Sequence, residues 1–88
     1  MSKTLRLVLD VLKPHEPNAL EFSLALADLG KNYRVKLTVT EVDKKTESTI
    51  VTIEGEDIHF DDIKEAIEKM GASVHSIDEV EVCGTEPT

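Results

Sequence analysis

The sequence lacks tryptophan and has only one cysteine, one tyrosine and two phenylalanines among its 88 residues. The single cysteine, Cys83, excludes an internal disulfide and a metal site built on paired cysteines. The three aromatic residues lie outside the central strands predicted below, so no rings are placed to stack unpaired bases as RNA-binding sheets do. No apolar run approaches the roughly 20 residues that span a bilayer.

Basic residues are also scarce, with 10 Lys and Arg against 18 Asp and Glu, and the net charge is −8. Residues 1–40 hold six basic and four acidic residues, whereas residues 41–88 hold four and fourteen. Because phosphate backbones and anionic lipids require a basic face, we expect neither nucleic acid nor a membrane as a partner. The N-terminus lacks the layout of a signal peptide, so a cytoplasmic location is expected.

Two hydrophobic periodicities alternate along the chain and predict its fold class. Alternation of apolar and polar residues predicts strands at residues 4–12, 33–42, 48–54 and 74–82. A first helix is expected from Pro17 to about Leu29, with Gly30 ending it in the left-handed conformation. A second helix is expected after a cap at His59, with Gly71 closing it.

The order β-α-β-β-α-β with right-handed crossovers predicts a ferredoxin-like α+β sandwich. Numbered along the chain, the strands would form an antiparallel sheet of order 4-1-3-2, with both helices on one face. We expect residues 1–84 to form this single domain and residues 85–88 to be a disordered tail. The turn between the second and third strands along the chain is expected to span residues 43–47.

The first predicted helix is apolar around most of its circumference, since its polar residues share one narrow arc. This apolar arc is about twice as wide as the stripe that a surface helix needs to meet one core. An 88-residue chain has little material to cover both sides, so we expect a homo-oligomer. The interface candidates lie on this helix and on the sheet face that the helices leave uncovered. They are Leu20, Leu24, Ala27, Val8 and Leu12.

The predicted sheet brings the end of the first strand beside the start of the last. Histidines and carboxylates that meet there would suit a divalent cation or acid–base chemistry. The alternative is one wet face of an ordinary strand, and no recognised metal motif is present. These candidates are Asp10, His15, Glu16, His75, Asp78 and Glu79. Asp43 and Glu47 form a second group, for which Ca²⁺ or Mg²⁺ would be the expected ion and a solubilising hairpin tip is the alternative.

Three stretches carry a resemblance to a known family: LVLDVLKPHEPN at 7–18, VTIEGEDI at 51–58 and GASVHSIDEVEV at 71–82. The chain resembles the archaeal proteins of domain of unknown function family 211. The resemblance implies a ferredoxin-like fold and a subunit of a ring-like homo-oligomer. It implies no reaction, so it assigns no catalytic residue. The positions that match the family's pattern are Asp10, His15, Glu16, His75, Ser76, Asp78 and Glu79.

The leading hypothesis is a small, acidic, non-enzymatic cytoplasmic protein that acts as a ring-like homo-oligomer in a structural or binding role. The alternative is a regulatory module that binds a small molecule or a divalent cation, Ca²⁺ first, beside the first strand–helix loop and the last strand. An enzyme that uses His15 or His75 is the third hypothesis, and no cofactor is assigned.

Overall fold

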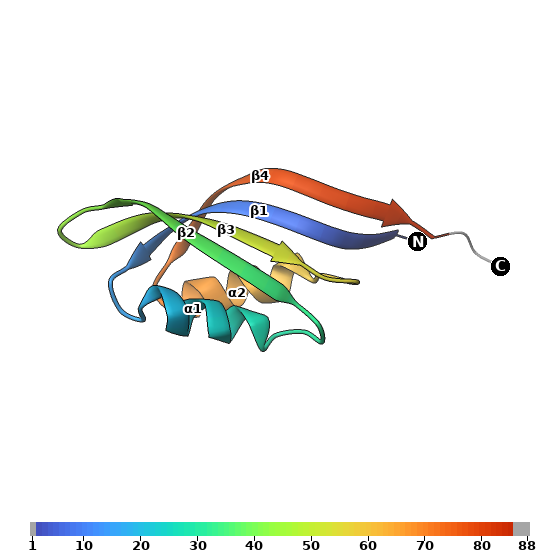
Figure 1. Cartoon of the computed structure of the whole chain (residues 1–88), viewed down its shortest axis with the longest axis horizontal. Coiled ribbons are helices and arrows are strands. Elements are labelled where there is room, and N and C mark those ends of the chain that lie inside the picture. Colours follow the sequence, from blue (N-terminus) through green and yellow to red (C-terminus); the bar gives the residue numbers. More distant parts are fainter. Residues whose placement is uncertain (1, 86–88) are drawn as a thin grey trace.

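The computed structural model describes residues 2–85 and has the predicted order of elements. The strands form one antiparallel sheet of order β2-β3-β1-β4, and both helices lie on the same face of it (Figure 1). This arrangement confirms the ferredoxin-like α+β sandwich. Of the predicted tail, residues 86–88 lie outside the described part. The elements are β1 Ser2–Pro14, α1 Ala19–Ala27, β2 Arg34–Val42, β3 Thr46–Glu54, α2 Phe60–Lys69 and β4 Ser73–Gly84.

The core lies between the helices and the facing side of β1 and β3. Successive strand residues point to opposite faces, so the odd-numbered residues of β1 from Leu7 to Lys13 are buried while their neighbours are half-buried or exposed. The same alternation in β3 buries Val51 and Ile53 opposite them. No helix within residues 2–85 is long and apolar enough to cross a membrane. The other core side chains are Leu7, Leu9, Val11, Phe22, Leu26, Ile58, Ile63, Ile67 and Ala72.

Helix α1 begins and ends at positions other than those predicted. Asn18 caps it: its side-chain oxygen accepts from the Glu21 backbone N–H at 2.8 Å, and the Glu21 carboxylate accepts from the Asn18 N–H at 3.2 Å. Pro17 therefore precedes the cap and is not the first helical residue. The helix ends at Ala27, before Gly30, and Gly30 has no positive φ. Gly30 instead admits the Tyr33 ring, whose atoms would lie 2.3 Å from an added Cβ.

Helix α2 follows the prediction more closely. His59 is the N-cap residue, although its side chain makes no capping hydrogen bond. Ile58 and Ile63 flank it and are both buried in the core, as a hydrophobic staple requires. Gly71 follows the helix with φ of +83°, the left-handed conformation that glycine adopts without steric cost.

The turn between β2 and β3 is shorter than predicted, because β3 starts at Thr46 and not at Ser48. The prediction missed this start because β1 continues to Pro14 and supplies ladder partners for two more residues. Thr46 lies opposite Pro14, and Glu47 lies opposite Lys13. Glu47 is thus a strand residue whose direction the sheet determines.

Strand β4 does not alternate regularly along β1. The register shifts between Val8 and Leu9 and again between Asp10 and Val11, and His75 and Asp78 are the β4 residues left without partners. Each of these bulges adds one unpaired residue to β4, so the side chains on either side of it do not follow a simple two-residue alternation. As a result Val74, Ile77 and Val80, three residues apart, lie opposite the buried residues Val11, Leu9 and Leu7. The helix-facing side of β4 is therefore more apolar than simple alternation suggests.

We expect Asn18→Ala to lower the free energy of unfolding by about 0.5–2 kcal/mol, because the first turn of α1 loses its side-chain cap. Urea unfolding of the two proteins measures this difference. Lys31→Ala, an exposed change in the loop after α1, is the control and should leave the unfolding midpoint unchanged. Equal midpoints for Asn18→Ala and the natural protein would show that the cap is dispensable.

Candidate functional site

A buried lysine closes the core where β1 ends. Lys13 is fully buried, although it carries a charge. Its ammonium donates to Glu47 Oε1 at 2.9 Å and to the Pro14 carbonyl at 2.8 Å, and it lies 5.9 Å from the centre of the Phe22 ring. The pair forms because the β1–β3 register places Lys13 and Glu47 directly opposite each other on the helix-facing side. The ammonium thus has two hydrogen-bond acceptors and an aromatic face in place of water.

The second Glu47 oxygen binds the loop that follows β1. His15 Nδ1 lies 3.0 Å from Glu47 Oε2, while its Nε2 lies 3.0 Å from the carbonyl oxygens of both Asp43 and Lys44. Glu47 therefore bridges Lys13 and His15, and His15 bridges the β1–α1 loop and the β2–β3 turn. We refer to Lys13, His15 and Glu47 as the loop cluster.

The partners of His15 determine its protonation state. Backbone carbonyls only accept, so Nε2 must carry a hydrogen, and an ionised Glu47 likewise requires one on Nδ1. The hydrogen bond to Glu47, assisted by the Lys44 carbonyl, accordingly raises the pKa of His15 above its ordinary 6.5. The hydrogen bonds from His15 and then Lys13 lower the pKa of Glu47. The cluster is thus a set of two cations around one carboxylate.

The site residues predicted on β1 and β4 are not all brought together. Asp10 lies opposite Ser76, as the predicted topology requires, and the Ser76 hydroxyl donates to Asp78 Oδ1 at 2.6 Å. His75 is an exposed bulge residue, and within residues 2–85 the partners of the His15 ring are Glu47 and the carbonyls of Asp43 and Lys44, not His75. Glu16 is exposed, and Glu79 accepts from Arg6 Nε at 3.0 Å. His15, in the loop after β1, is instead held by Glu47 and by the carbonyls of the β2–β3 turn, so the two histidines do not form one site.

The two residues of the predicted hairpin group have different surroundings. The Asp43 side chain is exposed and only its carbonyl meets His15, whereas Glu47 is partly buried between two cations. Within residues 2–85, no three His, Cys, Asp or Glu side chains are grouped so that they could hold a metal ion. The Ca²⁺ or Mg²⁺ sites remain predictions.

The predicted interface residues lie largely on the surface. Leu20 and Leu24 are 68% and 56% exposed on α1, with Ala27 half-buried beside them. On the other sheet face Leu12 is exposed and Val8 half-buried. The sequence reasoning missed Ile77 and Val80 as exposed apolar residues, because the β4 bulges that reorient them leave no signal in the pattern. It also missed Lys13, which alternation does place on the same face as Val11.

We expect Lys13→Ala to lower the free energy of unfolding by about 2–5 kcal/mol, as truncation of a buried aliphatic chain does. Lys13→Met keeps the packed stem and should therefore cost less than Lys13→Ala, although it also removes the hydrogen bonds to Glu47 and the Pro14 carbonyl. Urea unfolding of both variants measures the two values. If Lys13→Met were as destabilising as Lys13→Ala, the charge and not the packed stem would be the main contribution of this lysine.

The loop cluster should make stability depend on pH through His15 and Glu47. A raised pKa in His15 stabilises the fold below about pH 6.5 and loses this effect as pH rises through the folded pKa. A lowered pKa in Glu47 stabilises the fold above about pH 4.5 and loses this effect as pH falls through the folded pKa. The joint contribution is therefore largest between about pH 4.5 and 6.5.

We expect His15→Gln to lose more stability at about pH 5.5 than at about pH 9, measured by urea unfolding at both values. His75→Gln is the matched control, because the His75 ring is exposed and makes no hydrogen bond or ion pair with any residue of 2–85, and the variant should show the pH dependence of the natural protein. An equal loss for His15→Gln at both pH values would contradict a charged His15.

Comparison with known proteins places these features in a family. The family model described as uncharacterized ArCR, domain of unknown function 211, matches residues 5–86, which reach from β1 to beyond the end of β4. An uncharacterized protein of Methanocaldococcus jannaschii is 52% identical over 75 residues, which cover 85% of this chain and 77% of that protein. The chain therefore belongs to domain of unknown function family 211.

Proposed function

We propose that the protein works as a subunit of a ring-like homo-oligomer with a structural or binding role and no enzymatic one. The observation that carries the proposal is the apolar surface of α1. Leu20, Leu24 and Ala27 are spaced four and three residues apart, so they form one stripe along the helix. Phe22 and Leu26 point into the core, and no part of residues 2–85 buries Leu20 or Leu24. A second copy of the chain is the partner that would remove this stripe from water.

A second apolar surface lies on the edge strand β4. Ile77 and Val80 are 49% and 58% exposed, although they lie opposite Leu9 and Leu7, which are buried under the helices. Figure 1 shows that the part of β4 near the C-terminus extends beyond both helices, together with the start of β1. The core-facing side of β4 is thus apolar where the chain supplies no cover.

Two different exposed apolar surfaces favour a head-to-tail contact between copies. If the α1 stripe of one copy meets β4 of the next, the growing assembly keeps one free surface of each kind, and repeated contacts close into a ring where the rotation between neighbours allows it. A symmetric contact between two α1 stripes would instead stop at a dimer. The small size of the domain supports association, because a chain of this length buries a limited share of its own surface.

Two single variants and their mixture test this arrangement. Leu24→Lys places a charge in the α1 stripe and Val80→Lys places one on β4, and both positions are exposed enough to leave the fold intact. For a head-to-tail ring, each variant alone should be a monomer. An equimolar mixture should form a heterodimer, because each variant retains the surface that the other has lost. Sedimentation velocity at micromolar concentration measures the species, and circular dichroism checks the fold.

Val42→Lys is the matched control, since it makes the same change at an exposed residue where β2 meets the turn. It should retain the assembly of the natural protein. A natural protein that sediments as a monomer would defeat the proposal. Variants that assemble normally would show that neither surface is the contact. Loss of assembly in Leu24→Lys alone, with Val80→Lys unaffected, would replace the ring by a symmetric dimer.

A further inference from the structure

The face of the sheet opposite the helices carries a grid of polar residues. In the register of β2, β3 and β1, Arg34 lies opposite Glu54, which lies opposite Arg6. In the adjoining row Lys36 lies opposite Thr52, which lies opposite Val8. Residues that are opposite each other share a face, so three cations from two rows point to the same side. Neighbouring strands are about 4.8 Å apart, so β1 and β2, on either side of β3, are about 10 Å apart. The long side chains of Arg6, Arg34 and Lys36 can reach one small ligand across that distance.

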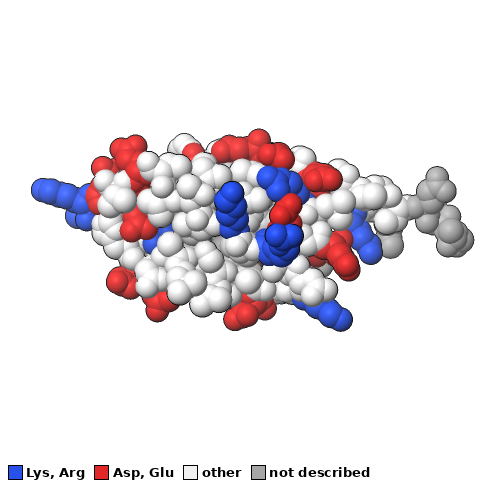
Figure 2. Space-filling model, in the orientation of Figure 1, with Lys and Arg blue, Asp and Glu red and all other residues white. Residues whose placement is uncertain are grey.

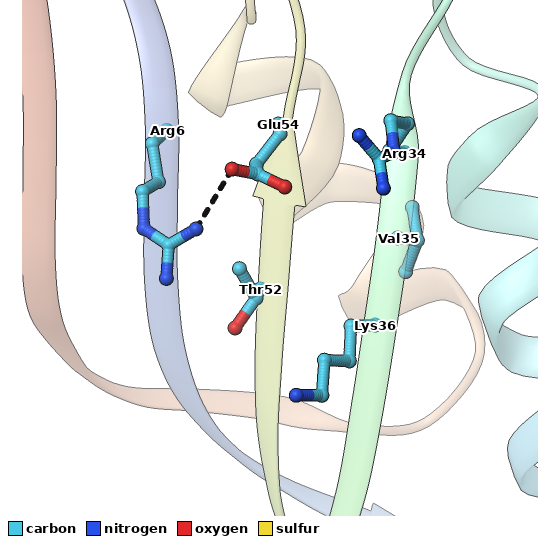
Figure 3. A pocket seen from close by; sticks show the side chains of 6 residues that line it. All are labelled: Arg6, Arg34, Val35, Lys36, Thr52 and Glu54. Atoms are coloured by element: carbon cyan, nitrogen blue, oxygen red, sulfur yellow. Dashed lines mark hydrogen bonds and ion pairs between the residues drawn. The ribbon is translucent and has the colours of Figure 1, made fainter.

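These side chains surround a pocket with a volume of about 260 Å³. Figure 2 shows basic side chains gathered around a carboxylate near the middle of the visible face. Figure 3 shows Arg6, Arg34 and Lys36 extending toward the space above Glu54 and Thr52. The lining residues are Arg6, Arg34, Val35, Lys36, Thr52 and Glu54.

The three cations differ in how they are held. Arg6 is oriented by two carboxylates, since Nη1 donates to Glu54 at 2.8 Å and Nε donates to Glu79 at 3.0 Å. Its Nη2 takes part in neither of these bonds. Arg34 and Lys36 are exposed and make no ion pair with any residue of the described chain. The pocket therefore combines one fixed guanidinium with two cations whose charges are not neutralised.

We propose that this pocket binds the phosphoryl group of a small phosphate compound. The lining carries three positive charges and one negative charge, and Glu79, which pairs with Arg6 from outside the lining, adds a second carboxylate. The remaining positive charge comes from Arg34 and Lys36, and it favours a doubly charged phosphate over a singly charged carboxylate. Guanidinium groups bind phosphate oxygens with paired hydrogen bonds, and lysine adds a compact charge. The Thr52 hydroxyl, at the floor of the grid, supplies a further donor. Free phosphate and a phosphomonoester share this chemistry.

The pocket is a local cluster of basic residues on a chain that is acidic as a whole. A net charge of −8 repels anions in general, so phosphate would be attracted only where cations outnumber carboxylates locally. Three of the six basic residues in the first 40 positions are in this pocket. The patch is a single pocket and not a basic stripe, so it fits a small anion rather than the backbone of a nucleic acid.

The test titrates the full chain with inorganic phosphate at low salt, followed by ¹H–¹⁵N NMR and calorimetry. We expect saturable shifts centred on Arg34, Lys36 and Thr52. Arg34→Ala and Lys36→Ala should each weaken binding about tenfold or more, since each removes a charge-assisted contact. Glu54→Gln should strengthen binding, because it removes the one negative charge from the lining while leaving an acceptor for Arg6.

Lys45→Ala, at the turn that lies at the other end of the β2–β3 hairpin, is the matched control and should leave phosphate affinity unchanged. Acetate should bind more weakly than phosphate. Glycerol phosphate distinguishes the two sources: tighter binding than inorganic phosphate identifies a phosphomonoester, and weaker binding identifies free phosphate. No saturable shift, or equal weakening by Lys45→Ala and Lys36→Ala, would overturn the proposal. These affinities are independent of the sedimentation results, so the two proposals can fail separately.

Discussion

The antiparallel register of β1 and β3 is the constraint on which both faces of the molecule depend. It runs without a bulge over nine residue pairs, from Arg6 opposite Glu54 to Pro14 opposite Thr46. On the helix side it brings Lys13 to Glu47, and it brings the Thr49 hydroxyl to the Val11 carbonyl at 2.6 Å. Because side chains alternate, the same register places the cations of the outer pocket on the opposite side. A slip of one residue would turn Lys13 outward and Arg6 into the core.

The buried Lys13–Glu47 pair makes a shift by two residues costly, because that shift keeps Lys13 on the buried face but moves it away from Glu47. A buried ion pair adds little stability compared with apolar residues of the same volume, since both charges must leave water. A buried ammonium without its partner is much less favourable. A chain that paired β1 and β3 in another register, with Lys13 still inside, would have to bury that charge away from Glu47. The pair therefore contributes to the choice of one register more than to overall stability. His15 extends this effect to the β2–β3 turn, because it reaches Glu47 and two turn carbonyls together.

The topology and the helix-facing residues could be predicted because local patterns determine them. Leu7, Leu9 and Val11 alternate, Gly71 has the conformation expected of a helix end, and Leu20 and Leu24 are exposed as the wide apolar arc of α1 indicated. The loop cluster could not be predicted, since it depends on how far β1 extends and on which residue faces Lys13 across the sheet. The β4 bulges could not be predicted either, because they depend on the pairing of β4 with β1 and the local sequence pattern does not indicate which residues stay unpaired. His75 and Asp78, predicted to converge with His15, became bulge residues instead.

The two proposed activities use different sides of the sheet and can coexist. The α1 stripe and the apolar residues Ile77 and Val80 lie on the helix side, whereas Arg34 and Lys36 lie in the grid on the other face. Contacts through α1 and β4 would leave that grid open to solvent in every copy. A ring built in this way would repeat the phosphate pocket around its circumference, and its acidic surface elsewhere would keep phosphate from binding between the pockets. Assembly on one face would thus present several copies of a binding site on the other, which would give a protein of this size a physical basis for multivalent binding.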